Sequence, residues 1–327
     1  MPQSTPPSPL FFWGDTPEDE YYASQGVRNS KSYFQTPNAK IFTQSWLPLD
    51  PNQPIKATIF MTHGYTANCS WSFQEICITY AKWGYAVYAA DLIGHGDSDG
   101  LRGYMGDMNK AAVTSLSYFV SVRKSEEYCD LPAYLFGESM GGLITMLMYL
   151  QSETGMWSGL IFLAPLFVIP EEMISKLHLA LYGLLFGLAD TWAVMPDFRV
   201  GRNVVKNVEK LKKMVLDPKR YAGKLRVGTA REALRMTNYV QNNFDKVTVP
   251  FLALHGTLDG LALHSGSEML YEKAMTAKED KGLKLYEGMY HSLINGEPDE
   301  NVDLVLADMK TWIDEQTQKH GSICADN

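Results

Sequence analysis

The chain has few cysteines, no excess of positive charge and no apolar run long enough to cross a bilayer. Its 327 residues include 29 Lys and Arg against 37 Asp and Glu, a formal net charge of −8. Because binding nucleic acid requires clustered basic side chains, this balance argues against a nucleic-acid partner. The apolar stretch at residues 177–189 (LHLALYGLLFGLA) is shorter than the roughly 18–20 residues of a transmembrane helix. We interpret it as a buried or lid helix, with peripheral membrane contact as the alternative.

The cysteines and the N-terminal segment bear on the cellular compartment. Cys69, Cys77, Cys129 and Cys324 show neither metal-binding nor redox spacing. The first residues, MPQSTPPSPLFFWGDTPEDEYY, contain no positively charged region followed by an apolar one, so they do not predict a secretory signal. We therefore expect free thiols, a cytoplasmic location and a flexible N-terminal arm over residues 1–20.

What the chain does contain is an alternation of short apolar runs with helical patterns, which predicts an α/β fold with a mostly parallel central sheet flanked by helices. Several of the runs are apolar throughout, as expected when both faces of a sheet are covered. The predicted strands are 40–47, 56–62, 85–90, 133–137, 159–164, 251–255 and 283–287. The predicted helices are 70–82, 107–124, 141–151, 265–274 and 301–317.

The alternation stops between Pro165 and Val249. That stretch has helical periodicity with Pro and Gly breaks, and it is too long for an ordinary loop. We predict a helical cap or lid over residues 166–249, inserted into a core formed by residues 21–165 and 250–320. Residues 321–327 are predicted to form a loose tail.

A candidate nucleophile lies where one predicted strand meets a helix. Residues 133–142 read AYLFGESMGG, so Gly137, Ser139 and Gly141 form G-x-S-x-G between an apolar run and a helical pattern. A serine on a tight strand-to-helix turn needs neighbours without side chains, which glycine supplies. The alternative interpretation, an ordinary glycine-rich turn, does not explain the strand and the helix on either side.

The other groups that ester chemistry requires occur in the expected chain order. Tyr65 follows His63-Gly64 after an apolar strand, so its amide and that of Met140 are the candidate oxyanion donors. Asp259 follows the run FLALHG, and His291 follows the last predicted strand. The order Ser, Asp, His predicts a catalytic triad of Ser139, Asp259 and His291.

Two other patterns receive a structural interpretation. His95 and Asp99, like His255 and Asp259, match the H-x-x-x-D spacing of some acyltransferases, but nothing else in the chain supports that fold. Asp91 and Asp99 are not accompanied by a cluster of further ligands, so we expect them to order glycine-rich turns, and we predict no metal site.

Taken together, these residues resemble the plant family of monoacylglycerol lipase-like and caffeoylshikimate esterase-like enzymes of the α/β-hydrolase superfamily. The most specific stretches are GHGDSDGLRGYMGDM, YLFGESMGGL, APLFVIPEEM, YGLLFGLADTWAVMPD and LYEGMYHSLINGEPDE. The resemblance implies an α/β-hydrolase core with a helical cap, no cofactor, and hydrolysis of a monoacylglycerol, a lysophospholipid or a hydroxycinnamoyl ester. It places Ser139, Asp259 and His291 on the family's triad positions, and Tyr65 and Met140 on its oxyanion positions.

The chain departs from the family pattern at two places beside these residues. The family usually reads HGYGSD, whereas residues 63–68 read HGYTAN; it also reads HGTADGVTCP, whereas residues 255–264 read HGTLDGLALH. We expect altered substrate choice rather than altered ester chemistry. The predicted substrate pocket comprises Thr66, Leu166, Leu184, Trp192, Leu261 and His264.

Alternatives remain open at this point. They are transfer of the acyl group to an alcohol, recruitment to an unidentified ester, a non-catalytic ligand-binding relative, and membrane contact through the cap. The sequence does not specify an oligomeric state.

Overall fold

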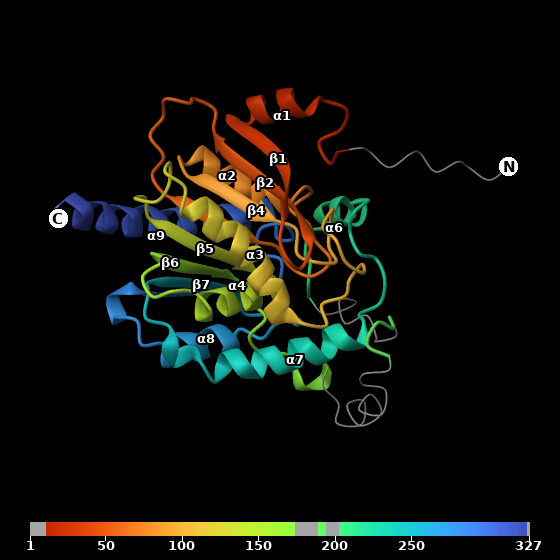
Figure 1. Ribbon diagram of the computed structural model, residues 1–327. Helices are drawn as coiled ribbons and strands as arrows, with labels where there is room; N and C mark the ends of the chain where they lie inside the picture. Colours follow the sequence, from red (N-terminus) through yellow and green to blue (C-terminus); the bar gives the residue numbers. More distant parts are fainter. Residues whose placement is uncertain (1–10, 174–188, 194–202, 326–327) are drawn as a thin grey trace.

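A sheet whose strands are mostly parallel organises the protein (Figure 1). The computed structural model describes residues 11–173, 189–193 and 203–325. Within these ranges the sheet has eight strands in the order β1-β2-β4-β3-β5-β6-β7-β8. β2 pairs antiparallel with both β1 and β4, and all the other pairs are parallel. The strands are β1 (Val27–Gln35), β2 (Lys40–Pro48), β3 (Thr58–Thr62), β4 (Ala86–Ala90), β5 (Ala133–Glu138), β6 (Gly159–Leu163), β7 (Phe251–Gly256) and β8 (Lys281–Tyr286).

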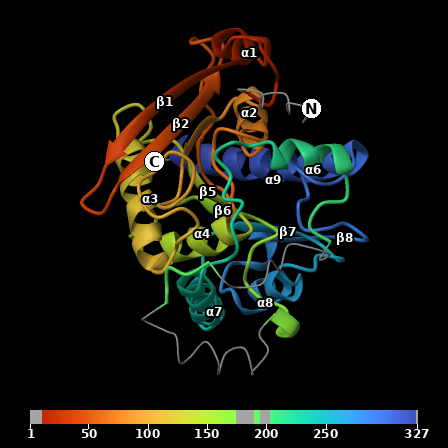
Figure 2. The same cartoon turned by 90° about the vertical axis from the view of Figure 1, so that its right-hand side faces the viewer.

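Helices cover both faces of this sheet (Figures 1 and 2). The described helices are α1 (Glu18–Ser24), α2 (Gln74–Lys82), α3 (Met108–Arg123), α4 (Met140–Leu150), α6 (Val208–Val215), α7 (Val227–Gln241), α8 (Ser265–Lys273) and α9 (Asp299–Ala325). Short 3₁₀ turns are η1 (Glu171–Met173), η2 (Phe244–Lys246) and η3 (Lys278–Asp280). None of the helices in the described ranges is long and apolar enough to cross a membrane.

The central strands divide their side chains between two hydrophobic cores, because successive residues of a strand point to opposite faces. In β5, Tyr134 and Phe136 join the core under α2 and α9, whereas Ala133 and Leu135 join the core under α3 and α4. All the residues of β3, β6 and β7 are buried as well. The continuously apolar runs in the sequence are therefore explained by burial on both faces.

The segment between β6 and β7 is helical where it is described. It contains α6, α7 and two 3₁₀ turns, and no strand within the described ranges. Trp71, after β3, donates its indole N–H to the carbonyl of Lys213 in α6 at 2.8 Å. The amide of Lys206, just before α6, binds the carbonyl of Gly296, after β8, at 2.9 Å. The inserted segment thus lies beside loops at the carboxyl end of the sheet.

The chain ends contain more regular structure than the sequence predicted. β1 was missed because it is an edge strand with mostly exposed side chains, so it shows no apolar alternation. The arm predicted over residues 1–20 includes the start of α1. The predicted tail is helical as far as Ala325, because α9 continues beyond its apolar face.

Candidate active site

Ser139 occupies a strained turn between β5 and α4. Its φ of 55° and ψ of −122° lie in a region that L-residues rarely adopt. A Cβ added at Gly137 would lie 2.5 Å from Thr145 Oγ1, and one added at Gly141 would lie 2.5 Å from the carbonyl oxygen of His63. The motif glycines therefore allow α4 to approach β5 and the end of β3 closely, and this approach holds Ser139 at the carboxyl edge of the sheet.

The structure joins the three predicted triad residues in one hydrogen-bonded chain. His291 Nε2 lies 2.8 Å from Ser139 Oγ, and His291 Nδ1 lies 2.6 Å from Asp259 Oδ2. Asp259 Oδ1 accepts the amides of Leu261 at 2.8 Å and Ala262 at 2.9 Å. The carboxylate is thus fixed by backbone donors on one oxygen and by imidazole on the other.

Burial and neighbouring charges shift the pKa values of Asp259 and His291 in opposite directions. Burial would raise the pKa of Asp259, but the imidazoles of His291 and His255 outweigh it and hold that pKa well below its usual range. Burial would lower the pKa of His291, but the Asp259 carboxylate raises it above its ordinary value of 6.5, with a smaller contribution from Glu138. Glu138, half-buried directly before Ser139, has a pKa raised to about 7, because its carboxyl group is removed from solvent.

A second histidine, for which the sequence predicted no role, contacts the same carboxylate oxygen. His255 Nε2 lies 3.1 Å from Asp259 Oδ2 and 2.9 Å from the carbonyl oxygen of Ala262, while its Nδ1 lies 2.8 Å from Ser267 Oγ in α8. His255 and Asp259 are both buried. The H-x-x-x-D spacing was the signal that could have identified this pair.

The candidate oxyanion loop runs beside the nucleophile. A Cβ added at Gly64 would lie 3.3 Å from Ser139 Cβ, which places the following residue, Tyr65, next to the serine. Buried His63 supports the loop, since its Nε2 accepts the amide of Leu92 at 3.0 Å. Met140 begins α4, and amides in the first turn of a helix have no carbonyl partner within that helix.

Thr66, which replaces the glycine of the family pattern, has a strained backbone conformation. It is buried, and its φ of 69° lies in the left-handed region. Glycine adopts this conformation without strain, whereas a β-branched residue does so at a cost. The family glycine therefore suits the backbone at this position, and Thr66 adds strain beside Tyr65.

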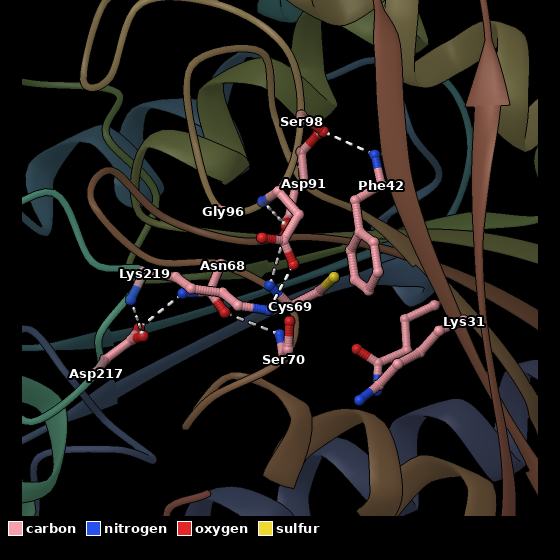
Figure 3. Close-up of polar contacts among 12 residues, drawn as sticks. Lys31, Phe42, Asn68, Cys69, Ser70, Asp91, Gly96, Ser98, Asp217 and Lys219 are labelled. Atoms are coloured by element: carbon pink, nitrogen blue, oxygen red, sulfur yellow. Dashed lines mark hydrogen bonds and ion pairs between the residues drawn. The ribbon is translucent and has the colours of Figure 1, made fainter. Parts of the chain in front are cut away.

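Asp91 orders the turns around the oxyanion loop, as expected from the sequence (Figure 3). Its Oδ1 accepts the amide of Cys69 at 2.7 Å, and its Oδ2 accepts the amide of Asp97 at 2.8 Å. The side chain is buried, which raises its pKa to about 6. A Cβ at Gly96 would collide with this carboxylate, so only glycine fits there.

The predicted pocket residues differ in their distance from Ser139. The amide of Leu166 binds the carbonyl of Ser139 at 2.9 Å, and Leu261 binds Asp259 through its amide. His264 precedes α8 and contacts Glu268, with 34% of its side chain exposed. Trp192 is 55% exposed. Leu184 lies outside the described residues.

Comparisons with known proteins place the chain in a family. The family model Hydrolase_4, described as serine aminopeptidase S33, matches residues 53–299. The chain belongs to the Hydrolase_4 family. Caffeoylshikimate esterase of Arabidopsis thaliana is 63% identical over 98% of this chain and 95% of its own length. Monoglyceride lipase of Rattus norvegicus is 29% identical over 87% of this chain and 90% of its own length.

A solved structure shows the same fold. A soluble variant of monoglyceride lipase from Saccharomyces cerevisiae, in complex with a substrate analogue, superimposes with a TM-score of 0.69 at 21% identity, covering 87% of this chain and 94% of that one. The predicted α/β-hydrolase fold and family resemblance are confirmed. As a Hydrolase_4 member with these relatives, the chain is a serine hydrolase that acts on esters.

Proposed function

We propose that the enzyme cleaves a hydroxycinnamoyl ester of the caffeoylshikimate type through an acyl-enzyme on Ser139. The observation that carries the mechanism is the hydrogen-bonded chain from Ser139 through His291 to Asp259. The substrate class is supported by the 63% identity to caffeoylshikimate esterase over nearly the whole chain.

In the first step, Ser139 Oγ attacks the ester carbonyl while His291 Nε2 takes its proton. Asp259 holds the imidazole in the required tautomer and stabilises the imidazolium that forms. The amides of Tyr65 and Met140 donate to the oxyanion, and each such donor contributes about 3–4 kcal/mol to barrier lowering. His291 then protonates the leaving alcohol, and water repeats the sequence on the acyl-enzyme.

We also propose that the inserted segment encloses the substrate. The segment 166–249 would act as a cap over the core, with Leu166, Trp192, Leu261 and His264 around the acyl group and Thr66 beside the oxyanion. Leu166 has the strongest support, since its amide binds the backbone of Ser139. We place the enzyme in the cytoplasm, acting on a small-molecule ester.

We also propose that α6 provides the peripheral membrane contact of the cap; most of the apolar stretch 177–189, for which the sequence left this alternative open, lies outside the described residues. Val208, Leu211 and Val215 share one face of this helix and are 63%, 42% and 61% exposed. Lys212 on the same helix forms an exposed ion pair with Glu209 at 2.8 Å, and exchange of that partner for an anionic lipid headgroup is part of the proposal. Flotation with anionic and neutral vesicles tests this assignment: Leu211→Ser should reduce binding to the anionic vesicles, and equal flotation of both proteins would refute it.

The test of the proposed function has two arms. A fluorophosphonate probe should label the wild-type enzyme and fail to label Ser139→Ala. A hydrolysis panel of caffeoylshikimate, a monoacylglycerol, a lysophospholipid and an aryl acetate should show the highest kcat/KM for caffeoylshikimate. No labelling of Ser139 would refute the mechanism, whereas preference for a glycerol ester would refute only the substrate. Adding an acceptor alcohol distinguishes hydrolysis from acyl transfer.

A further inference from the structure

A buried polar pair attaches the oxyanion loop to the segment that follows α6 (Figure 3). Asn68 Nδ2 donates to Asp217 Oδ2 at 2.7 Å, while Asn68 Oδ1 accepts the amide of Ser70 at 3.0 Å. Asp217 Oδ1 accepts the amide of Lys219 at 2.9 Å. All four side-chain polar atoms of the pair therefore have a partner. Asn68 is 1% exposed and Asp217 is 9% exposed, so water cannot easily replace these bonds.

The same two segments meet at a second point, nearer to the nucleophile. The carbonyl oxygen of Thr66 accepts the amide of Tyr221 at 3.3 Å. The ring of Tyr221 lies edge-on to that of Tyr65, with centroids 6.2 Å apart. Because Gly64 lies against Ser139 and Thr66 is held by Tyr221, the intervening Tyr65 amide has its position fixed from both sides.

We propose that Asn68 and Asp217 are positioning residues for the ester hydrolysis. Their hydrogen bond holds the Tyr65 amide at the distance from Ser139 that an oxyanion requires, and it makes that distance depend on the inserted segment. The inference rests on the proposed function, which gives Tyr65 the donor role. Neither residue touches the substrate or the reacting atoms.

The hydrogen bond between Asn68 and Asp217 can be reversed by exchanging the two residues. An aspartate at position 68 would still accept the amide of Ser70, and an asparagine at position 217 would still accept the amide of Lys219. The remaining hydrogen bond would then run in the opposite direction, from the side-chain amide introduced at position 217 to the carboxylate introduced at position 68. The double exchange therefore restores every bond, whereas each single exchange places two donors or two acceptors face to face.

Charge makes the single exchange Asn68→Asp sensitive to pH. The ionisable groups facing Asp217 are Lys219, Asp91 and, through its ion pair with Lys219 at 2.5 Å, Asp97. Burial already raises the pKa of Asp217. A second carboxylate beside it would share one proton at low pH and lose it as the pH rises.

The experiment compares N68D, D217N and the double variant N68D/D217N with wild type, using acylation by an aryl ester. At pH 8, N68D should lose about tenfold or more in the acylation rate, with KM changing less than about twofold. Its activity should fall with rising pH, opposite to the rise caused by deprotonation of His291. The double variant should recover to within about twofold of wild type. Asn38→Asp adds the same charge in the β1–β2 turn and should leave the rate unchanged.

Three results would overturn the inference. They are an unchanged rate in folded N68D, a double variant as slow as N68D, and recovery of the thermal midpoint without recovery of the rate, which would indicate a purely structural role. Failure of the proposed function is separable from these results, because it would appear as wild-type Ser139 that does not react with the phosphonate probe.

Discussion

The closeness of α4 to the end of β3 predicts that Gly141→Ala separates the two proposed oxyanion donors, the amides of Met140 and Tyr65. A Cβ at this position would lie 2.5 Å from the carbonyl oxygen of His63, and nearer still to that of Thr62. The distance to the Thr62 oxygen is 2.2 Å and real Cβ contacts essentially never fall below 3.0 Å, so the backbone must open by at least about 0.8 Å. Both obstacles are backbone atoms, which cannot rotate away.

The displacement moves Met140, in α4, away from Tyr65, in the oxyanion loop. A shift of this size costs up to about 100-fold in rate, which corresponds to about 2.7 kcal/mol of barrier. Overpacking lowers the free energy of unfolding by about 1–3 kcal/mol as well. We expect the acylation rate in a stopped-flow burst assay to fall about 30- to 100-fold, with KM nearly unchanged.

Gly159→Ala provides the control. Its Cβ would lie 3.0 Å from the carbonyl oxygen of Pro250, at the start of β6 and at the opposite end of the sheet from Ser139. This variant should lose stability, measured as the thermal midpoint, but keep its acylation rate. A folded Gly141→Ala enzyme that acylates within twofold of wild type would refute the reasoning, as would equal rate losses in the two variants.

The remaining predictions concern pH, the second histidine and backbone strain. Because the base must be neutral, kcat/KM should fall as the pH drops through the pKa of His291, which lies above its ordinary value. Glu138→Gln removes a carboxylate that raises this pKa, so it should shift this limb of the pH–rate profile to lower pH, and an upward shift contradicts the assignment. His255→Leu removes a hydrogen-bond donor from Asp259 and should lower kcat/KM about tenfold. His255→Gln keeps a donor and should retain most of the wild-type kcat/KM. Equal losses in the two variants would exclude positioning of Asp259 through that bond. Thr66→Gly should raise the free energy of unfolding in urea by about 1 kcal/mol, and a decrease would show that the left-handed φ is not strained.

The sequence predicted the fold well where local pattern and topology agree. β3, β6 and β7 are buried throughout, and β5 is buried up to Gly137, because both faces of these strands are covered. In a parallel sheet the loops after such strands meet at one edge, so Ser139, Asp259 and His291 were expected at the same end. The structure brings these three side chains within hydrogen-bonding distance.

Contacts made by loops could not be predicted in the same way. His255 meets Asp259 only because the loop after β7 folds back through the amides of Leu261 and Ala262, a conformation with no sequence periodicity. Asn68 and Asp217 are 149 positions apart and belong to segments without regular structure. Pairings of this kind depend on tertiary folding rather than on local propensity.

The inserted segment is tied to the base as well as to the oxyanion loop. The amide of His291 binds the carbonyl of Asn203 at 3.0 Å, and the amide of Ser292 binds the carbonyl of Val204 at 2.9 Å. These residues stand just before α6, and Asp217 stands just after it. One short stretch therefore holds both the proposed base and the proposed oxyanion loop. Since the two must be in place in the same transition state, a change within residues 203–221 should alter catalysis even where it touches no substrate.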